Sequence, residues 1–81
     1  MAHYVYLLRC RDDTLYCGYT TDVERRVKTH NEGKGAKYTK TRLPVEVVYV
    51  EKCTDKSDAL KRECAIKRLS REQKLALLSE K

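Results

Sequence analysis

The residues of this sequence most able to do chemistry are polar side chains that fall on predicted apolar faces. Burying a charged group costs several kcal/mol unless it has a partner, so such positions are where function is expected. At about 100° per residue, Ala59, Leu60 and Ile66 define the apolar arc of a helix, and Glu63 falls within that arc. The Glu63 carboxylate either forms an i,i+4 ion pair with Lys67 at the edge of the core, or points across a sheet at a metal ion.

A second group of polar residues lies on an earlier predicted helix. Val23 and Val27 form its apolar stripe, and Arg26 and His30 flank that stripe one turn apart. A lone histidine beside such a stripe is a packed or capping residue in one interpretation and an acid–base group in the other. Arg26 can equally be one member of a solvated pair with Arg25. Folding alone does not require an arginine, a histidine and a glutamate on the inward flanks of two helices, so these residues are candidates for a functional site.

Tyrosine is the third unusual feature. The chain has six tyrosines and no phenylalanine or tryptophan, so every aromatic ring carries a hydroxyl group. Alternation along a strand places Tyr4 and Tyr6 on one face of the first predicted strand and Tyr16 on one face of the second. A buried tyrosine usually needs only a hydrogen-bond partner. Two tyrosines that face an arginine, a histidine and a glutamate would be better explained as a site.

The elements that must position these residues follow the order ββαβαα. Thr21 with Glu24, and Ser70 with Gln73, have the spacing of capping boxes, and Gly33 is the left-handed residue expected where the first helix ends. The strands are expected over residues 4–9, 15–20 and 45–53, a basic loop over 33–42, and the helices from Thr21 to about His30, from Thr54 or Asp55 to about Leu69, and from Ser70 to about Glu80. This order predicts an α/β (α+β) fold in one domain, residues 1–81, with a three-stranded, mostly antiparallel sheet flanked by helices.

Composition limits the classes of protein to consider. A formal net charge of +6 over 81 residues attracts polyanions, nucleic acid above all, although it is also compatible with an ordinary solvated surface. No apolar run is long enough to span a bilayer and no secretory signal is recognisable, so we expect a cytoplasmic protein without a membrane partner. The four cysteines lack the spacing of a zinc site and are expected to be small buried hydrophobic residues.

Taken in order, the tripeptides Tyr4-Val5-Tyr6 and Tyr16-Cys17-Gly18, then Arg26, His30 and Glu63, resemble the motifs of the GIY-YIG nuclease superfamily. Two further stretches, from Tyr16 to Asn31 and from Gly35 to Thr39, resemble its small bacterial single-domain members of the UPF0213 type. The chain departs from the pattern in three places. Tyr4 replaces the glycine of the first tripeptide, Asp13-Thr14 stands in the hairpin where a glycine is usual, and Tyr19 stands where some repair enzymes carry a lysine.

The resemblance implies a GIY-YIG endonuclease fold and hydrolysis of phosphodiester bonds in DNA, structure-selective and linked to repair or recombination. Glu63 would hold Mg²⁺ or Mn²⁺, and Arg26 would clamp the phosphoryl oxygens. The base that activates water is either a tyrosine, whose pKa of about 10 must then be lowered by positive charge, or His30, whose unperturbed pKa is about 6.5. The favoured hypothesis is Tyr6 as the base, with Tyr16 and His30 positioning it.

The partner implied is DNA, branched or single-stranded forms included. Its backbone would contact basic and aromatic residues, namely Arg25, Lys34, Lys37, Tyr38, Lys40, Arg42 and Lys67. One alternative is a nucleic-acid-binding domain with little or no unaided catalysis. Another is a catalytic subunit that a protein partner supplies with specificity, for which Leu75, Leu77 and Leu78 are the predicted contact unless they pack in the core.

Overall fold

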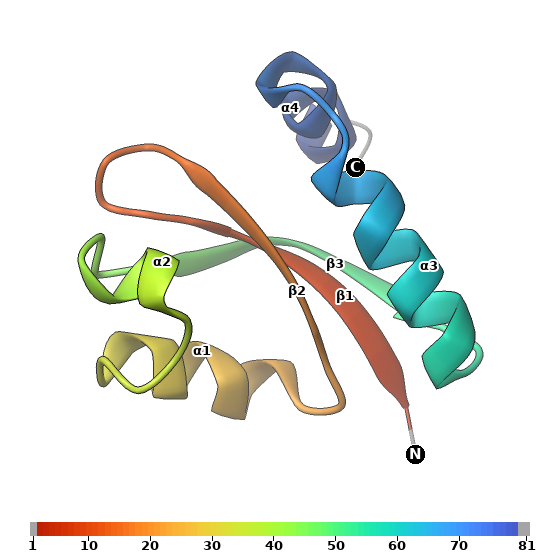
Figure 1. The fold of residues 1–81 in the computed structure, drawn as a ribbon, viewed down its shortest axis with the longest axis horizontal. Coiled ribbons are helices and arrows are strands. Elements are labelled where there is room, and N and C mark those ends of the chain that lie inside the picture. The colour runs from red at the N-terminus through yellow and green to blue at the C-terminus, as the bar shows by residue number, and fades with distance from the viewer. Residues whose placement is uncertain (1, 80–81) are drawn as a thin grey trace.

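The sheet consists of three antiparallel strands, and the strand at its centre pairs with both of the others. The computed structural model describes residues 2–79, in which the strands are β1 (His3–Arg9), β2 (Leu15–Thr20) and β3 (Glu46–Cys53). Their order across the sheet is β2-β1-β3, and β1 pairs antiparallel with both neighbours (Figure 1). The predicted fold class is confirmed, and β2 is an edge strand.

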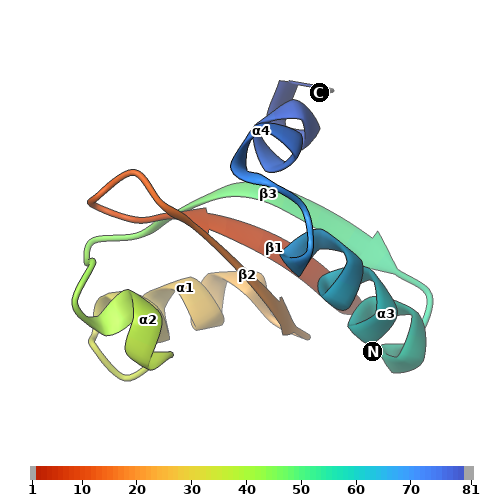
Figure 2. The ribbon, with the colours of Figure 1, turned by 45° about the horizontal axis from the view of Figure 1, so that its top comes forward.

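The helices lie on both faces of this sheet (Figure 2). They are α1 (Val23–Asn31), α2 (Lys37–Lys40), α3 (Lys56–Lys67) and α4 (Arg71–Ser79). None of the helices within residues 2–79 is long and apolar enough to cross a membrane. The end predicted for the last helix, Glu80, lies outside the described residues.

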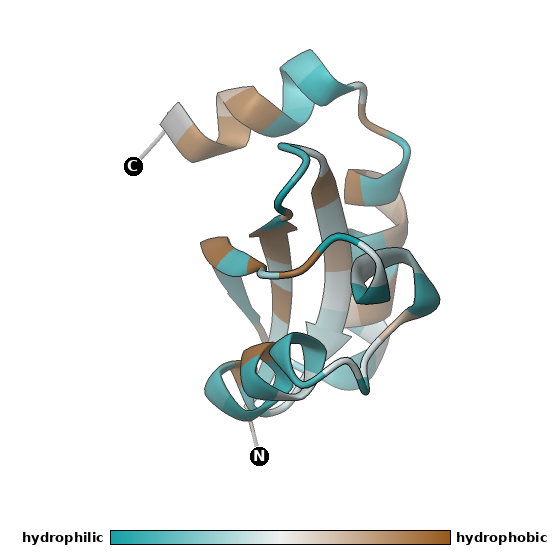
Figure 3. Cartoon of the chain, turned by 90° about the vertical axis from the view of Figure 1, so that its left-hand side faces the viewer, coloured by the Kyte–Doolittle hydropathy of each residue, from teal (hydrophilic) through white to brown (hydrophobic). Residues whose placement is uncertain are grey.

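β1 is buried on both sides because its side chains alternate between two apolar clusters. Val5 and Leu7 pack with the inner residues of α3, whereas Tyr6 and Leu8 pack with Val27 of α1. Hydrophobic stretches are concentrated in the strands and in the second half of α4, while α1 and the loop after it are largely hydrophilic (Figure 3). The sheet therefore separates an α1 face from an α3 face.

The segment 33–42, predicted to be a loop, contains the short helix α2. Its first turn closes because the backbone N–H groups of Thr39 and Lys40 both donate to the carbonyl of Ala36, at 3.2 and 3.1 Å. Thr39 is fully buried beneath this turn, so the segment is anchored to the protein rather than solvated. The left-handed backbone predicted at Gly33 is confirmed by its φ of 78°.

The capping box predicted for α1 is wrong by one residue. Asp22, not Thr21, is the N-cap, and its carboxylate accepts from the backbone N–H of Arg25 at 3.1 Å. The Thr20 hydroxyl in turn accepts from the backbone N–H of Asp22 at 3.1 Å, which holds the cap in place. The positive end of the helix dipole also stabilises a carboxylate at this position.

Predictions for the helices of the α3 face had mixed outcomes. Asp55 caps α3, and the capping box of Ser70 with Gln73 is confirmed by reciprocal bonds of 2.9 and 3.2 Å. Leu60 is 43% exposed, and Cys64 is exposed rather than buried. Both predictions were wrong because the stripe that α3 buries is narrow and neither side chain faces the sheet.

Candidate active site

Tyr6 forms the buried centre of the α1 face. It is 1% exposed, and it pairs across the sheet with Gly18 of β2. A methyl group built at Gly18 would lie 2.4 Å from the Tyr6 hydroxyl oxygen, so any other residue at this position would collide with the ring. The glycine of the second tripeptide is therefore required by the space that the tyrosine of the first one occupies.

His30 lies against Tyr6 and is equally buried, at 1% exposure. Its Nε2 lies 3.2 Å from the Tyr6 hydroxyl oxygen, and its Nδ1 lies 2.8 Å from Oγ1 of Thr39. Gly35 closes the space beside the ring, because a methyl group there would lie 2.2 Å from Nδ1. Both ring nitrogens are thus engaged by the protein, and the imidazole is held on α1 by contacts from β1 and α2.

Burial determines the protonation of this pair. It raises the pKa of Tyr6, although a hydrogen bond from Arg26 and the charge of that guanidinium act in the opposite direction. Burial also lowers the pKa of His30, and the nearby charge of Arg26 lowers it further. Near neutral pH the tyrosine is therefore protonated and the histidine is uncharged. Arg26 is exposed, and its guanidinium is close enough to the Tyr6 hydroxyl for its charge to act on the pKa of that group.

A series of stacked groups extends from His30 to the surface. The ring of Tyr16 makes an edge contact with His30 at a centroid distance of 5.5 Å and stacks on Tyr38 at 5.9 Å. The Arg42 guanidinium lies 4.1 Å from the centroid of the Tyr38 ring and bonds to Asp12 at 2.9 Å. Arg42 therefore ties α2 to the β1–β2 turn, so this predicted phosphate-binding residue is already engaged within the protein.

The other predicted nucleic-acid contacts have different environments. Arg25 and Arg26 line a polar hollow of about 240 Å³ between the end of β2 and α1. Lys67 is paired with Glu63 at 3.5 Å. The remaining three, here called the loop lysines, are exposed side chains in or just before α2: Lys34, Lys37 and Lys40.

Glu63 belongs to α3, which lies on the opposite face of the sheet from α1, the helix that carries His30 (Figure 2). The Sγ atom of Cys17 in β2 is 3.8 Å from the backbone carbonyl oxygen of Glu63, which places α3 directly over this strand. The Glu63 side chain is 19% exposed and forms the predicted i,i+4 pair with Lys67. Within the described part of the chain, no hydrogen bond or ion pair joins Glu63 to Tyr6, Arg26 or His30.

The available donors suit only a loosely held cation. Residues 2–79 contain no group of three or more histidine, cysteine, aspartate or glutamate side chains that could hold a metal ion. Burial, with the charge of Glu63 second, raises the pKa of the Cys17 thiol to about 11, so Cys17 is not a thiolate ligand. One carboxylate fits Mg²⁺, which keeps several waters and binds substrate phosphates, and does not make a preformed metal cage.

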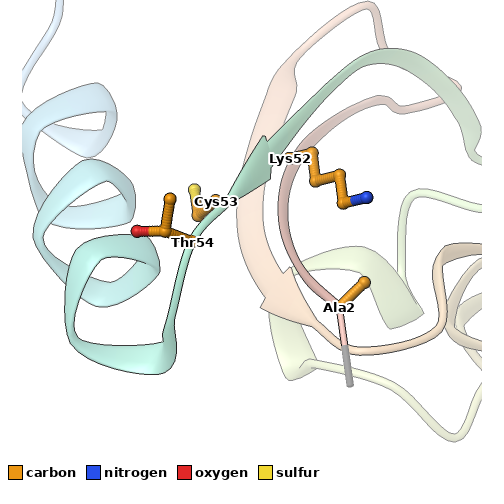
Figure 4. Close-up of a pocket in the computed structure, with 4 residues that line it drawn as sticks. All are labelled: Ala2, Lys52, Cys53 and Thr54. Carbon is orange, nitrogen blue, oxygen red and sulfur yellow. The ribbon is translucent and has the colours of Figure 1, made fainter.

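A larger surface hollow lies elsewhere. It has a volume of about 500 Å³ and is lined by Ala2, Lys52, Cys53 and Thr54, near the start of β1 and the end of β3 (Figure 4). Cys53 and Thr54 point toward α3, whereas Lys52 points away on the other side of the strand. None of the predicted site residues lines this hollow, so the Tyr6–His30 region is the better candidate site.

Residues missed from the sequence hold this region together. Thr39 and Gly35 contact the His30 ring, and Asn31 fixes the end of α1 to the residue just before β3 by bonding to the backbone N–H and carbonyl of Val45, at 2.8 and 3.1 Å. Gly35 and Thr39 fall in a basic stretch with no periodic pattern. The stretch was predicted to bind phosphates through its basic residues, and the signal that includes Gly35 and Thr39 themselves is its resemblance to the small bacterial members.

The domain is a three-stranded antiparallel sheet, flanked by helices, that brings tyrosines of two adjacent strands onto a histidine of the next helix. The family model described as the GIY-YIG catalytic domain matches residues 2–76, and the chain belongs to the GIY-YIG family.

Its relatives include UPF0213 proteins. The UPF0213 protein of Staphylococcus haemolyticus is 58% identical over 98% of this chain and 96% of its own length. The solution NMR structure of the UPF0213 protein BH0048 from Bacillus halodurans is 49% identical, with a TM-score of 0.65 over 100% of this chain and 86% of that one. The solution NMR structure of EF2693 from E. faecalis is 45% identical, with a TM-score of 0.67 over 99% and 85%.

Proposed function

We propose that this protein is a divalent-metal-dependent endonuclease that hydrolyses phosphodiester bonds in DNA. The observation that carries the proposal is the buried Tyr6 hydroxyl, 3.2 Å from an uncharged histidine nitrogen and close to an exposed arginine whose charge acts to lower the pKa of that hydroxyl. A structural tyrosine needs one hydrogen-bond partner. A tyrosine with both a proton acceptor and a cation near its hydroxyl oxygen is equipped to release its proton.

The Tyr6–His30 pair would act as one base. Both nitrogens of His30 are engaged, by Tyr6 and by Thr39, so a proton from water can reach His30 only through the tyrosine. As the attacking water loses a proton to the Tyr6 oxygen, the hydroxyl proton of Tyr6 passes to Nε2 of His30. The charge of Arg26 favours the phenolate character that Tyr6 acquires on the way. Tyr16 packs against the edge of His30 and positions it.

Arg26 would clamp the phosphate that is attacked. A planar guanidinium donates two parallel hydrogen bonds to phosphoryl oxygens, and this arginine is exposed beside the Tyr6 hydroxyl. A phosphate bound there would bring its water close to the Tyr6 hydroxyl. Hydrolysis then proceeds by in-line attack, and the 3′-oxygen leaves.

Glu63 would hold Mg²⁺ or Mn²⁺ together with water and substrate oxygens, and the bound ion would supply stabilisation of the charge on the leaving oxygen. Because β2 is an edge strand, no further strand separates the two faces at its outer side. A phosphate at that edge is accessible to Arg26 from the α1 face and to Glu63 from the α3 face. To hold the metal ion, Glu63 would have to give up its ion pair with Lys67.

The loop lysines, with Arg25 and Tyr38, would bind the DNA backbone near this edge. Phosphate contacts position a nucleic acid without reading its sequence, so we expect selectivity for shape, with branched or single-stranded DNA preferred. Such an activity would serve repair or recombination in the cytoplasm.

Cleavage assays with matched variants test the proposal. Plasmid and branched DNA are incubated with Mg²⁺ or Mn²⁺, with EDTA as the metal-free control. Wild-type protein should cut only with metal, and Glu63→Gln and Arg26→Ala should each lower the rate by about 100-fold or more. Arg26→Lys, which keeps the charge but not the planar fork, should also be impaired, whereas Glu72→Gln on α4 should cut normally.

A binding domain without unaided catalysis is the second candidate function. It is favoured by one observation, that Glu63 is paired with Lys67 on the opposite face of the sheet from His30. DNA binding that survives in all variants, together with no cleavage by wild-type protein under any metal condition, would establish this alternative and reject the nuclease.

A further inference from the structure

Thr39 occupies an unusual place for a polar residue. It lies in the four-residue helix α2, within a stretch rich in lysine, yet none of it is exposed. Its hydroxyl oxygen is 2.8 Å from Nδ1 of His30 and 3.0 Å from the carbonyl oxygen of Ala36. A hydroxyl group buried this completely must satisfy its hydrogen-bonding capacity within the protein, and these two contacts do so.

The donors and acceptors in this chain of contacts can be assigned by elimination. A hydroxyl group has one hydrogen to donate, and a carbonyl oxygen can only accept, so the Thr39 hydrogen goes to Ala36. The same oxygen must then accept from His30, which places a hydrogen on Nδ1. In an uncharged imidazole the other nitrogen carries a lone pair, so Nε2 accepts from the Tyr6 hydroxyl.

The surroundings of the ring hold the imidazole closely in this position. The Gly35 backbone is so close that a methyl group there would lie 2.2 Å from Nδ1, and Tyr16 contacts the ring edge. The ionisable groups that face His30 are Tyr6 from β1, Tyr16 from β2 and Arg26 from its own helix. The group that faces it from α2 is Thr39, which does not titrate in the physiological range.

We infer that Thr39 is a positioning residue that holds His30 in the tautomer protonated at Nδ1 and thereby aims the lone pair of Nε2 at the Tyr6 hydroxyl. Which histidine nitrogen carries the hydrogen is set by the bond that the other nitrogen makes. Without the Thr39 acceptor, His30 could place its hydrogen on Nε2, and that nitrogen could no longer take a proton from Tyr6.

The bond from Nδ1 of His30 to Thr39 is compatible with both protonation states of the Tyr6–His30 pair. When the hydroxyl proton of Tyr6 moves to Nε2, the tyrosine becomes a phenolate and the imidazole an imidazolium. Nδ1 keeps its hydrogen throughout and continues to donate to Thr39. The hydroxyl of Thr39 therefore neither gains nor loses a proton, and the ring need not turn during the transfer. The catalytic meaning of this bond rests on the proposed function, but the tautomer does not.

The tautomer can be measured directly. In ¹⁵N NMR spectra of the side chains, a protonated ring nitrogen and a bare one have widely separated shifts, and the chain has two histidines, His3 and His30. At a pH above the titration of His30, wild-type protein should show a protonated Nδ1 and a bare Nε2 at this residue. A protonated Nε2 in wild-type protein would overturn the inference outright.

Three variants identify the group responsible. Thr39→Ser keeps the hydroxyl and should keep the tautomer, whereas the nearly isosteric Thr39→Val should shift it toward a mixture or toward protonated Nε2. Thr41→Val, a change of the same kind at an exposed threonine beside α2, is the matched control and should have no effect. An unchanged tautomer in Thr39→Val would show that another group holds the ring.

Tyr6→Phe provides an independent check that does not alter α2. If Thr39 sets the tautomer, the hydrogen on Nδ1 should persist when the Tyr6 hydroxyl is absent. A switch to protonated Nε2 in this variant would show that Tyr6 is the determinant and would overturn the inference, even if Thr39→Val does not fold.

Cleavage gives the catalytic readout. Thr39→Val should lower kcat by about 10-fold or more with little change in KM and should alter the pH profile, and Thr39→Ser should restore both. A Thr39→Val variant that cuts DNA at the wild-type rate would reject the catalytic part of the inference. If wild-type protein cuts no DNA, the proposed function fails, and the NMR measurement alone decides the role of Thr39.

Discussion

Removal of the Tyr6 hydroxyl by Tyr6→Phe perturbs stability and chemistry in ways that can be separated. The variant removes a buried bond of 3.2 Å and leaves Nε2 of His30, in a side chain 1% exposed, without a partner. A buried acceptor left unsatisfied costs about 1–3 kcal/mol. Arg26 is exposed and can turn to water instead, so it adds little to this cost.

We therefore expect Tyr6→Phe to lower the free energy of unfolding by about 2 kcal/mol, which corresponds to a decrease in Tm of about 8–16 °C for a domain of this size. Urea denaturation at pH 7.5 measures the first quantity and thermal denaturation the second. Because Tyr6 is also the group that accepts the proton in the proposed mechanism, DNA cleavage under conditions where the variant is folded should fall by about 100-fold or more.

Tyr49→Phe is the matched control. The Tyr49 hydroxyl donates to the Glu51 carboxylate at 2.8 Å on β3, away from the candidate site. Its loss should cost about 1 kcal/mol of stability and leave cleavage unchanged. Full cleavage by Tyr6→Phe would refute Tyr6 as the base. Wild-type stability in that variant would refute the energetic argument.

Three further predictions follow from glycine packing, histidine burial and surface charge. Gly35→Ala should destabilise the protein by about 1–3 kcal/mol in urea because it overlaps the His30 ring, whereas Gly33→Ala, with a φ of 78° but no atom within 4 Å, should cost only about 1 kcal/mol. Because burial lowers the pKa of His30 in the folded state, the unfolded chain binds more protons below about pH 6.5, so stability should fall as the pH drops from 7.5 to 5.0; the pH dependence should weaken in His30→Gln. Replacing the loop lysines together by alanine should reduce the slope of log affinity for DNA against log salt by up to about 2.7, and an unchanged slope would exclude them from the interface.

The secondary structure was largely predictable because its signals are local. Runs of β-forming residues located all three strands to within one residue, and β2 is placed over Leu15–Thr20 as predicted. The capping box of Ser70 and Gln73 needs only its own turn, and it formed as expected. At the start of α1 two candidate caps stood side by side, and the choice of Asp22 over Thr21 depended on the further bond from Thr20.

Tertiary contacts account for the predictions that were wrong or absent. α2 was predicted as loop because its four residues have no periodicity, and it is stabilised by the burial of Thr39 against His30. Leu77 and Leu78 pack against the core, as expected if they are core residues and not a contact for a protein partner. Leu75 is 41% exposed. Which leucines of a short helix are buried depends on where that helix docks, and this is not encoded within its own turn.

The candidate site, too, was predictable where it depends on local patterns and not where it depends on contacts between elements. The sequence by itself determined which residues share a face of each element: Tyr6 with Leu8 on the central strand, and Glu63 with the buried stripe of α3. Only the tertiary structure decided that the helix of Glu63 lies on the opposite face of the sheet from that of His30 (Figure 2), and that Thr39 and Gly35 enclose the imidazole. The physical reason is that a helix or strand period specifies direction around one axis, whereas contacts between elements depend on how the sheet and its two helical layers pack.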